Sequence, residues 1–162
     1  MAKTSKTNEA VNLKVNEKKW SKELMATGWT VIPNIIIERQ QALGLDAVDI
    51  NILLHLAMYW WSADSKPHPS KSTLAKAIGL DPRTIQRHIA RLEAGGLIKR
   101  IERRIPSVGS KTNIYDLSGL IKEAKPYALE RAQELVEKEA IKKMKAGKKG
   151  KPKLKPVETE EN

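Results

Sequence analysis

STLAKAIGLDPRTIQRHIARLEAGGLIKR, residues 72–100, is the part of the sequence that decides the fold. The beginning of this stretch predicts a short helix that ends at Ile78. Ser70 or Ser72 is expected to cap it. Gly79 then suits the left-handed conformation that often closes a helix. We therefore expect a short helix that ends in a tight turn.

A second helix follows the turn, over residues 82–94. Asp81 and Pro82 predict its start, because a carboxylate accepts from the free N–H groups of a first turn and proline already has the helical φ. Gly95 and Gly96 end the helix. Three apolar residues recur at helical spacing and predict its buried side, namely Ile85, Ile89 and Leu92.

The other side of this helix is basic and carries an amide. Arg83, Thr84, Gln86 and Arg87 lie near its beginning, and Arg91 follows one turn later. An arginine can donate two hydrogen bonds to guanine, and a glutamine can bind adenine in the same bidentate manner. The start of such a helix reaches deepest into a DNA major groove. We therefore expect the first four residues to contact bases and Arg91 to contact the DNA backbone.

Residues 97–117 predict a basic β-hairpin, with strands over Leu97–Ile105 and Lys111–Leu117 and a turn between them. Its cations are expected to contact the DNA backbone or the minor groove: Lys99, Arg100, Arg103, Arg104 and Lys111. The alternative is an exposed edge strand whose cations block aggregation. Further backbone contacts are expected at the start of the first helix, where free N–H groups favour a phosphate, from Ser70, Lys71 and Ser72.

The pattern from Leu74 to Ile98 resembles the bacterial winged helix-turn-helix. In that family a segment of the form Leu-Ala-x-x-x-Gly-Leu-Ser-x-Arg-Thr-Val precedes a helix that ends in Leu-x-x-x-Gly-Leu-Ile. The segment Trp29–Asn34 and the helical stretch Ile50–Trp61 resemble the beginning of the DNA-binding domains of phage and plasmid replication proteins. The same module occurs in transcription regulators. The resemblance implies a mainly α fold with a small β-hairpin, the wing, and double-stranded DNA as the partner.

Shorter elements are predicted upstream of these helices. Trp29–Ile32 alternates weakly, which favours a short strand, and Pro33 opens a helix over Asn34–Leu43 that Gly44 closes. Asp46 is expected to cap the next helix. The buried side of that helix is predicted from apolar residues at helical spacing, namely Ile50, Leu53, Leu54, Ala57, Met58 and Trp61.

Both ends of the chain have the composition of solvated arms. We expect residues 1–27 to be largely disordered, with at most a short helix over Trp20–Met25. Residues 147–162 are rich in lysine and then acidic, which predicts a second disordered and charged segment.

A helical extension over residues 118–146 is predicted between the winged helix-turn-helix of residues 28–117 and the final tail. Ser118 is expected to cap it, and Pro126 is expected to interrupt or restart it. A homodimer contact is expected through this helix, by Leu129, Ala132 and Val136, or through Trp60 and Trp61. Such a dimer would bind an inverted repeat with half-sites about 34–36 Å apart.

The composition of the 162 residues restricts the classes of function. A net charge of +11 favours polyanionic partners. There is no cysteine, which excludes disulfides, zinc ribbons and thiol catalysis. No apolar run approaches the length of a membrane span, so we expect a cytoplasmic protein that associates with the nucleoid. Motifs for phosphate loops, nucleophiles or paired carboxylates are missing, and no metal-ligand spacing joins the three histidines. We therefore expect no enzymatic activity, no metal and no cofactor.

These observations favour sequence-specific binding of double-stranded DNA by a transcription regulator. The alternative is a plasmid or phage protein for replication initiation or partition that binds repeats at an origin. A third hypothesis of a different class is a module that binds protein or RNA through the same fold.

Overall fold

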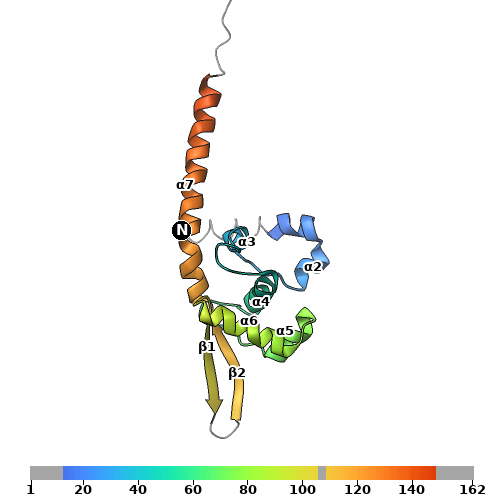
Figure 1. Ribbon diagram of the computed structural model, residues 1–162. Coiled ribbons are helices and arrows are strands. Elements are labelled where there is room, and N and C mark those ends of the chain that lie inside the picture. Colours follow the sequence, from blue (N-terminus) through green and yellow to red (C-terminus); the bar gives the residue numbers. More distant parts are fainter. Residues whose placement is uncertain (1–12, 106–108, 149–162) are drawn as a thin grey trace, which may run out of the picture.

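Within the described residues, helices predominate and one antiparallel hairpin interrupts them (Figure 1). The structure is a computed structural model that describes residues 13–105 and 109–148. Residues 13–20 are helical and precede the remaining elements, which are α2 (Lys22–Ala26), α3 (Asn34–Glu38), α4 (Ala47–Met58), α5 (Lys71–Ile78), α6 (Pro82–Ala94), β1 (Lys99–Ile105), β2 (Gly109–Asp116) and α7 (Ser118–Lys148).

The predicted caps at the start of α4, α5 and α6 are confirmed, whereas Ser118, the predicted cap of the C-terminal helix, is the first residue of α7, and the Asp116 carboxylate accepts from its N–H. The Asp46 carboxylate accepts hydrogen bonds from the N–H groups of Val48 and Asp49, both at 2.9 Å. Ser70, and not Ser72, caps α5. The Asp81 carboxylate accepts from the first turn of α6, directly before the proline. These bonds satisfy N–H groups that a helix start leaves free, and they fix where each helix begins.

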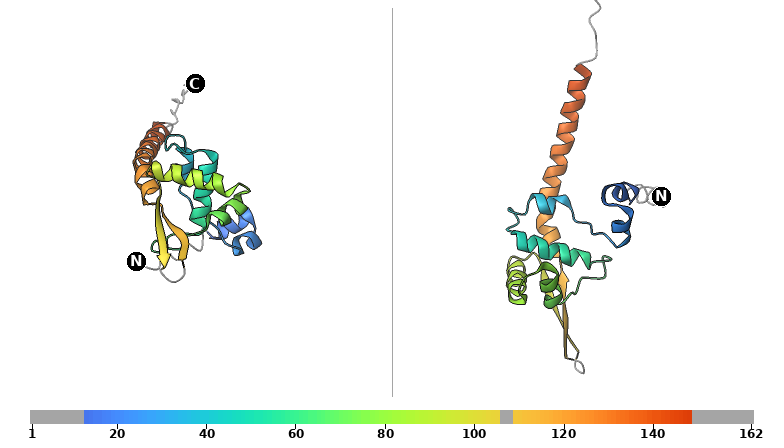
Figure 2. Two further views of the ribbon diagram at one scale, coloured as in Figure 1. Left: turned by 60° about the horizontal axis from the view of Figure 1, so that its bottom comes forward. Right: turned by 90° about the vertical axis from the view of Figure 1, so that its right-hand side faces the viewer.

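The core lies where α4, α5 and α6 pack against one another (Figure 2). Gly79 closes α5 with a φ of 79°, a left-handed conformation that glycine adopts without strain. This turn brings α6 back across α5 and α4. The predicted apolar side of α6 is confirmed, because its three members are buried: Ile85, Ile89 and Leu92.

The predicted buried side of α4 is wrong in part. Leu54, Met58 and Trp61 are exposed, and Trp61 keeps 82% of its accessible surface. The helix instead buries a side that is rotated from the predicted one and is formed by Asp49, Ile52, Leu53 and Leu56. Apolar residues occur on almost every side of this helix, so periodicity alone did not define the side that faces the core.

The two elements predicted upstream of α4 also differ in the structure. Residues 29–32 form no strand, since no second strand lies beside them in the described chain. The helix that Pro33 opens ends at Glu38 instead of Leu43. A series of turns follows, and it closes at Gly44, whose φ is 70°.

The first arm is more helical than its composition indicated. Helical residues 13–20 and α2 replace the single short helix expected over Trp20–Met25. Residues such as Leu13, Lys14 and Glu17 favour a helix even where no core covers them, and no residue of α2 is buried. Residues 1–12, where the same disorder was expected, lie outside the described chain.

The predicted hairpin is present and is attached to the core at its base. Strands β1 and β2 pair antiparallel, and a bulge interrupts the register between Ile101 and Arg103. Tyr115 is buried at the base, and its N–H donates to the carbonyl of Pro67 at 2.8 Å. The tip of the predicted turn, residues 106–108, lies outside the described chain.

Helix α7 is continuous through Pro126, where an interruption was expected. Pro126 is exposed, so water can bind the carbonyl that lost its helical partner. The helix runs to Lys148, two residues past the predicted end, and it extends from the domain on the side away from the hairpin (Figure 1). The predicted tail from residue 149 onward is outside the described chain.

Across the described residues, none of the helices combines the length and the apolar character that crossing a membrane requires.

The first turn of α7 contacts the turn that follows α6 through backbone atoms. The N–H of Leu120 donates to the carbonyl of Leu97 at 2.7 Å. A Cβ atom at Gly119 would overlap the carbonyl of Gly96 and lie 3.1 Å from the Leu97 oxygen. Glycine at position 119 therefore permits a contact that any side chain would obstruct.

Substitution Gly119→Ala should lower the free energy of unfolding by about 1–3 kcal/mol, because two backbones must separate to admit the methyl group. Chemical denaturation followed by circular dichroism measures this change. The control is Gln133→Ala, an exposed position on the same helix, which should change stability by less than about 0.5 kcal/mol. Equal stability of both variants would contradict the proposed close contact.

Asp116 connects the hairpin base to two neighbouring segments. Its carboxylate accepts from the Lys66 ammonium at 2.6 Å and from the N–H of Ser118 at 2.9 Å. The hydrogen bond from Lys66, followed by that from the Ser118 N–H, lowers the pKa of Asp116 to about 2.

Substitution Asp116→Asn should destabilise the fold by about 1–2 kcal/mol at pH 7, a value reduced because water screens the half-exposed Lys66. A carboxylate whose pKa is lowered by folding stabilises above its unfolded pKa, and this effect is lost as pH falls through its folded pKa of about 2. The stability difference from the wild type should therefore be full above about pH 4 and vanish near pH 2. Denaturation curves across this range, with the exposed Asp64→Asn as control, test the sign. A difference that grows with acid would refute it.

Candidate nucleic-acid interface

The exposed side of α6 brings the predicted base-contacting residues together. Arg83, Gln86 and Arg87 are exposed, and Thr84 is half-buried beside them. They lie on the side opposite the buried stripe of the helix. Together with the start of α5 they line one surface hollow, formed by Lys71, Asp81, Pro82, Arg83, Thr84, Gln86, Arg87 and Ala90.

Lys71 joins this surface from α5. Its ammonium donates to the side-chain oxygen of Gln86 at 3.1 Å, which orients the amide and places a cation beside it. Of the other predicted phosphate contacts, Ser70 uses its hydroxyl for the cap and for a 2.7 Å hydrogen bond with Thr73. Ser72 is exposed in the first turn. Lys71 is therefore the member of this group that the structure brings next to the base-contacting set.

Asp81 introduces a negative charge at the rim of the same hollow. Its carboxylate accepts from the N–H of Arg83 at 2.5 Å, so its charge is directed at the helix start. The cap therefore positions the first arginine while it disfavours a phosphate at this position.

The predicted hairpin cations divide into two kinds. Lys99 and Lys111 are exposed. Arg103 lies across the hairpin and donates to the carbonyl and to the hydroxyl of Thr112, both at 2.8 Å. The side chain of Arg104 lies outside the described part of the structure.

Arg100, another predicted backbone contact, is paired with Glu93 within the protein. Its Nε donates to Glu93 at 2.5 Å, and its backbone N–H donates to the same carboxylate at 3.0 Å. The side-chain hydrogen bond from Arg100 lowers the pKa of Glu93. The pair joins the end of α6 to β1, so its charge is neutralised where the strand begins.

Arg91, which was predicted to contact the DNA backbone, forms several contacts within the protein. Its guanidinium pairs with Asp46 at 3.1 Å, contacts Asp49, and donates to the carbonyl of Gly44 at 3.2 Å. The residue therefore connects α6 to the start of α4. The reason for these contacts is tertiary: Asp49 is fully buried, and a buried carboxylate requires a partner.

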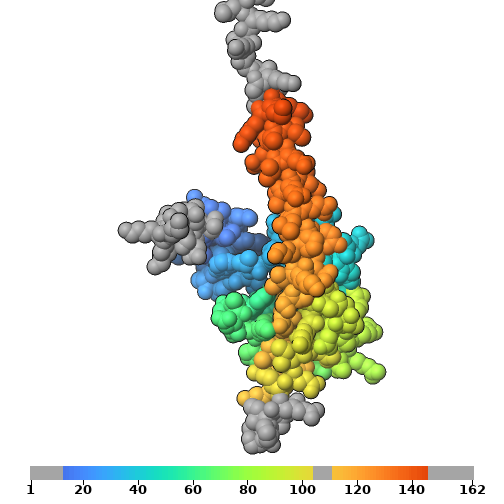
Figure 3. Space-filling view, turned by 90° about the vertical axis from the view of Figure 1, so that its left-hand side faces the viewer, coloured from blue at the N-terminus to red at the C-terminus, as the bar shows by residue number. Residues whose placement is uncertain are grey.

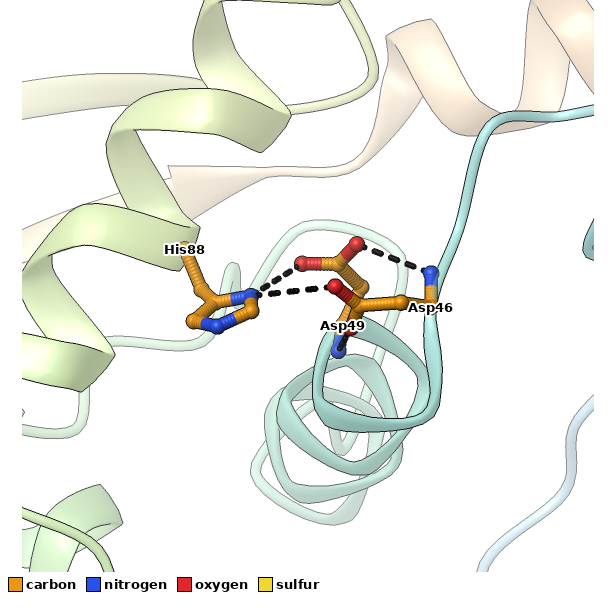
Figure 4. Close-up of side chains that lie close together, drawn as sticks. All are labelled: Asp46, Asp49 and His88. Carbon is orange, nitrogen blue, oxygen red and sulfur yellow. Dashed lines mark hydrogen bonds and ion pairs between the residues drawn. The ribbon is translucent and has the colours of Figure 1, made fainter.

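His88 completes the group around Asp49 (Figure 4). Its Nδ1 lies 2.8 Å from Asp49 and 3.7 Å from Asp46. Burial raises the pKa of Asp46, but the hydrogen bond from the Asp49 N–H and the charge of Arg91 outweigh this effect, and the pKa lies below its usual value. Sequence spacing had not revealed this group, because its members are about 40 residues apart in the chain and meet only through packing.

Asp46, Asp49 and His88 have ligand atoms within 4.8 Å of one another, a spacing that a metal ion could use. The guanidinium of Arg91 already contacts both carboxylates and supplies the positive charge. The chemistry of the donor set therefore fits an internal ion-pair network that positions α6.

Residues 43–98 match the protein family described as a helix-turn-helix domain. This range begins before α4 and ends after α6. With the basic hairpin directly behind it, the domain is of the winged type. The chain contains a winged helix-turn-helix.

The comparison with solved structures gives one match that supports this fold, a DnaD domain, and one of lower similarity. The crystal structure of the N-terminal domain of DnaD protein from Geobacillus kaustophilus HTA426 is 20% identical, with a TM-score of 0.51, and the match covers 74% of this chain and 96% of that one. The crystal structure of a transcriptional regulator is 19% identical, with a TM-score of 0.39, over 88% of this chain and 98% of that one. No curated protein sequence matches the chain.

The fold class predicted from the sequence is thus confirmed, and a winged helix-turn-helix supports DNA binding. Both a regulator and a replication protein are compatible with it. In this winged helix-turn-helix, α6 occupies the position of the recognition helix and the β1–β2 hairpin that of the wing.

Substitution Arg91→Ala should lower the free energy of unfolding by about 2–4 kcal/mol, because it leaves the buried Asp49 without its guanidinium partner. Arg87→Ala, one turn earlier on the same helix and exposed, should change stability by less than about 0.5 kcal/mol. Thermal and chemical denaturation of both variants provide the measurement. If Arg91→Ala were as stable as Arg87→Ala, the positioning role of the ion pair would be disproved.

Proposed function

We propose that this protein binds double-stranded DNA at specific sequences, with the recognition helix in the major groove and the wing on the backbone or in the minor groove. The observation that carries the proposal is the exposed cationic side of α6. Arg83 and Arg87 are exposed there, and among the described residues neither forms an ion pair with a carboxylate. Their donors are therefore available to a ligand.

The chemistry of this side suits base edges. Arg83 and Arg87 can each donate two bonds to guanine, and Gln86 can bind adenine. Lys71 holds the Gln86 oxygen, so on binding either the amide reorients toward a base or the lysine moves to a phosphate. Gln86 must therefore exchange its hydrogen bond with Lys71 before it binds an adenine.

The wing supplies charge without the same capacity for base recognition. Lys111 and Lys99 are exposed cations on a hairpin that extends away from the core (Figure 1). Lysine is a point charge, which suits phosphate contacts. We assign Lys111 to the DNA backbone, together with Arg103 beside it in the register.

The biological role that fits best is a transcription regulator that acts by occupancy of its site. Replication initiation or partition at origin repeats is the second candidate, favoured by the resemblance of residues 29–34 to replication-protein domains. Selection of bound sites from a random DNA pool, followed by footprinting on native DNA, distinguishes them. A site at a promoter supports the regulator, and tandem repeats at an origin support the replication protein. Absence of any preferred sequence would reject both.

We also propose that the protein acts as a homodimer. Of the two surfaces expected from the sequence, the tryptophan pair offers only Trp61, because Trp60 packs partly against the core. The outer side of α7 exposes several apolar residues along its length. The helix is therefore the better candidate for the contact.

Substitution Arg87→Ala should weaken binding to the selected site by about 1–3 kcal/mol and relax the preference at one base pair, because a bidentate contact is lost. Affinities for the selected and for a scrambled duplex, measured by fluorescence anisotropy, test this. Arg87→Lys is the matched control, since it keeps the charge without the fork geometry. Equal losses on both duplexes would assign Arg87 to a phosphate instead.

Substitution Lys111→Ala should weaken binding to all sequences about equally and reduce the slope of log affinity against log salt by about 1. Lys138→Ala, which removes a cation from the distal part of α7, should leave the slope unchanged. The affinity of the wild type and of both variants is measured at several salt concentrations. An unchanged slope for Lys111→Ala would show that this residue of the wing does not contact DNA.

A further inference from the structure

An apolar cavity lies between α3, α4 and the start of α7, away from the exposed side of α6. Its volume is about 140 Å³. Three of its lining residues, Ile36, Leu53 and Leu120, are buried, whereas Val31 and Ile121 are exposed. The cavity therefore has a buried apolar floor. It opens to solvent between the segment before α3 and the start of α7, which lie side by side (Figure 3).

The size and the lining of this cavity suit an apolar molecule better than water. A water molecule inside a protein needs about two to four polar partners, and the lining side chains here are almost all aliphatic. A cavity of about 150 Å³ with such walls stays dry and can bind a molecule the size of benzene. An occupant of this kind would restore the van der Waals contacts that the walls lack.

Trp60 supplies the cavity with one hydrogen-bond donor. Its ring is part of the lining. The indole Nε1–H is buried, and none of the described residues accepts a hydrogen bond from it. An indole N–H can only donate, and a buried donor without an acceptor destabilises the folded protein. A ligand with one acceptor atom would remove this defect.

A second hollow adjoins the cavity and shares Val31, Ala57 and Trp60 with it. Its volume is about 500 Å³, and its walls include the exposed rings of Trp29 and Trp61. No charged residue contributes to either lining in the part of the chain that the structure describes. The two spaces together resemble a small-molecule site, which is mostly apolar and has a few polar groups that orient the ligand.

We propose that this protein binds a small uncharged molecule that consists of an aromatic ring and one hydrogen-bond acceptor. The ring occupies the cavity between α4 and α7, and the acceptor receives the Nε1–H of Trp60. A carboxylate is disfavoured, because the lining offers no cation to pair with it. The site shares no residue with the basic hollow of α6, so it does not depend on the proposed DNA binding.

The position of the cavity gives ligand binding a structural effect. Its walls come from α4, through Leu53 and Ala57, and from α7, through Leu120. The N–H of Leu120 donates to the carbonyl of Leu97, directly after α6. A ligand in the cavity therefore joins α4 to the base of α7. Because it binds the folded state alone, it should also raise the melting temperature as its concentration rises.

Titration of the full chain with acetophenone, followed by ¹H–¹⁵N NMR, tests the site. The chain has four tryptophans, so each indole N–H can be followed separately, and Trp60→Phe identifies the Trp60 signal. This signal should move downfield and saturate, with a dissociation constant of about 1 mM or below for so small a ligand. The Trp20 signal, from outside both linings, should not follow the same curve. A Trp60 signal that does not move, or that moves without saturation, overturns the proposal.

Two further probes test the chemistry of the ligand. Toluene keeps the aromatic ring but has no acceptor, and it should bind about tenfold more weakly than acetophenone. Benzoate has a charged acceptor and should not bind. In Trp60→Phe, which keeps an aromatic wall without the N–H, acetophenone and toluene should bind equally. Binding of benzoate as strong as that of acetophenone contradicts the assignment to an uncharged ligand, and an unchanged preference for acetophenone in Trp60→Phe contradicts the role of Trp60.

Variants that fill the cavity locate the site. Ala57→Leu adds a larger side chain to the lining and should abolish the saturable shift, whereas Ala47→Leu makes the same change at the exposed first residue of α4 and should leave it intact. Ile121→Trp obstructs the opening from an exposed position, so the test does not depend on the folding of Ala57→Leu. Circular dichroism confirms that each variant is folded. Normal acetophenone binding by a folded variant of either kind would overturn the proposed site.

Discussion

The buried carboxylate of Asp49 determines how the recognition helix sits on the domain. No part of it is accessible to water, and its partners, Arg91 and His88, both belong to α6. An unpaired charge in this position would cost several kcal/mol. Helices α4 and α6 can therefore pack only in the orientation that brings these partners to Asp49. The same carboxylate closes the cap of α4 with Asp46, so the start of one helix and the rotation of the other are set together.

Positive charge has two uses in this protein, and the structure separates them. Arg91 and Arg100 form ion pairs with carboxylates of the protein. These pairs attach the recognition helix to α4 and to the wing. Arg83, Arg87 and Lys111 face outward. A net charge of +11 describes both groups equally, but only the second is available to a polyanion.

The local parts of the fold could be predicted from the sequence because their causes are local. A cap at Asp81 and a left-handed turn at Gly79 depend on neighbours within a few residues. The side of α4 that faces the core and the partner of Arg91 depend on what packs against each element. The path of α7 through Pro126 depends on whether water reaches the carbonyl that the proline leaves without a partner. From the sequence, the arginines of α6 were therefore equally good candidates for DNA contacts. In the structure, Arg91 differs from the others because it pairs with the buried Asp49.

The backbone contact between Gly119 and Gly96 gives the molecule a mechanical property. It attaches the base of α7 to the short turn that directly follows the recognition helix. A helix of 31 residues is about 46 Å long. A tilt of about 10° at the base would thus move the far end by about 8 Å at this length. Conversely, a displacement of several ångströms at the C-terminal end of α7 corresponds to only a small rotation at its base, next to the proposed recognition helix.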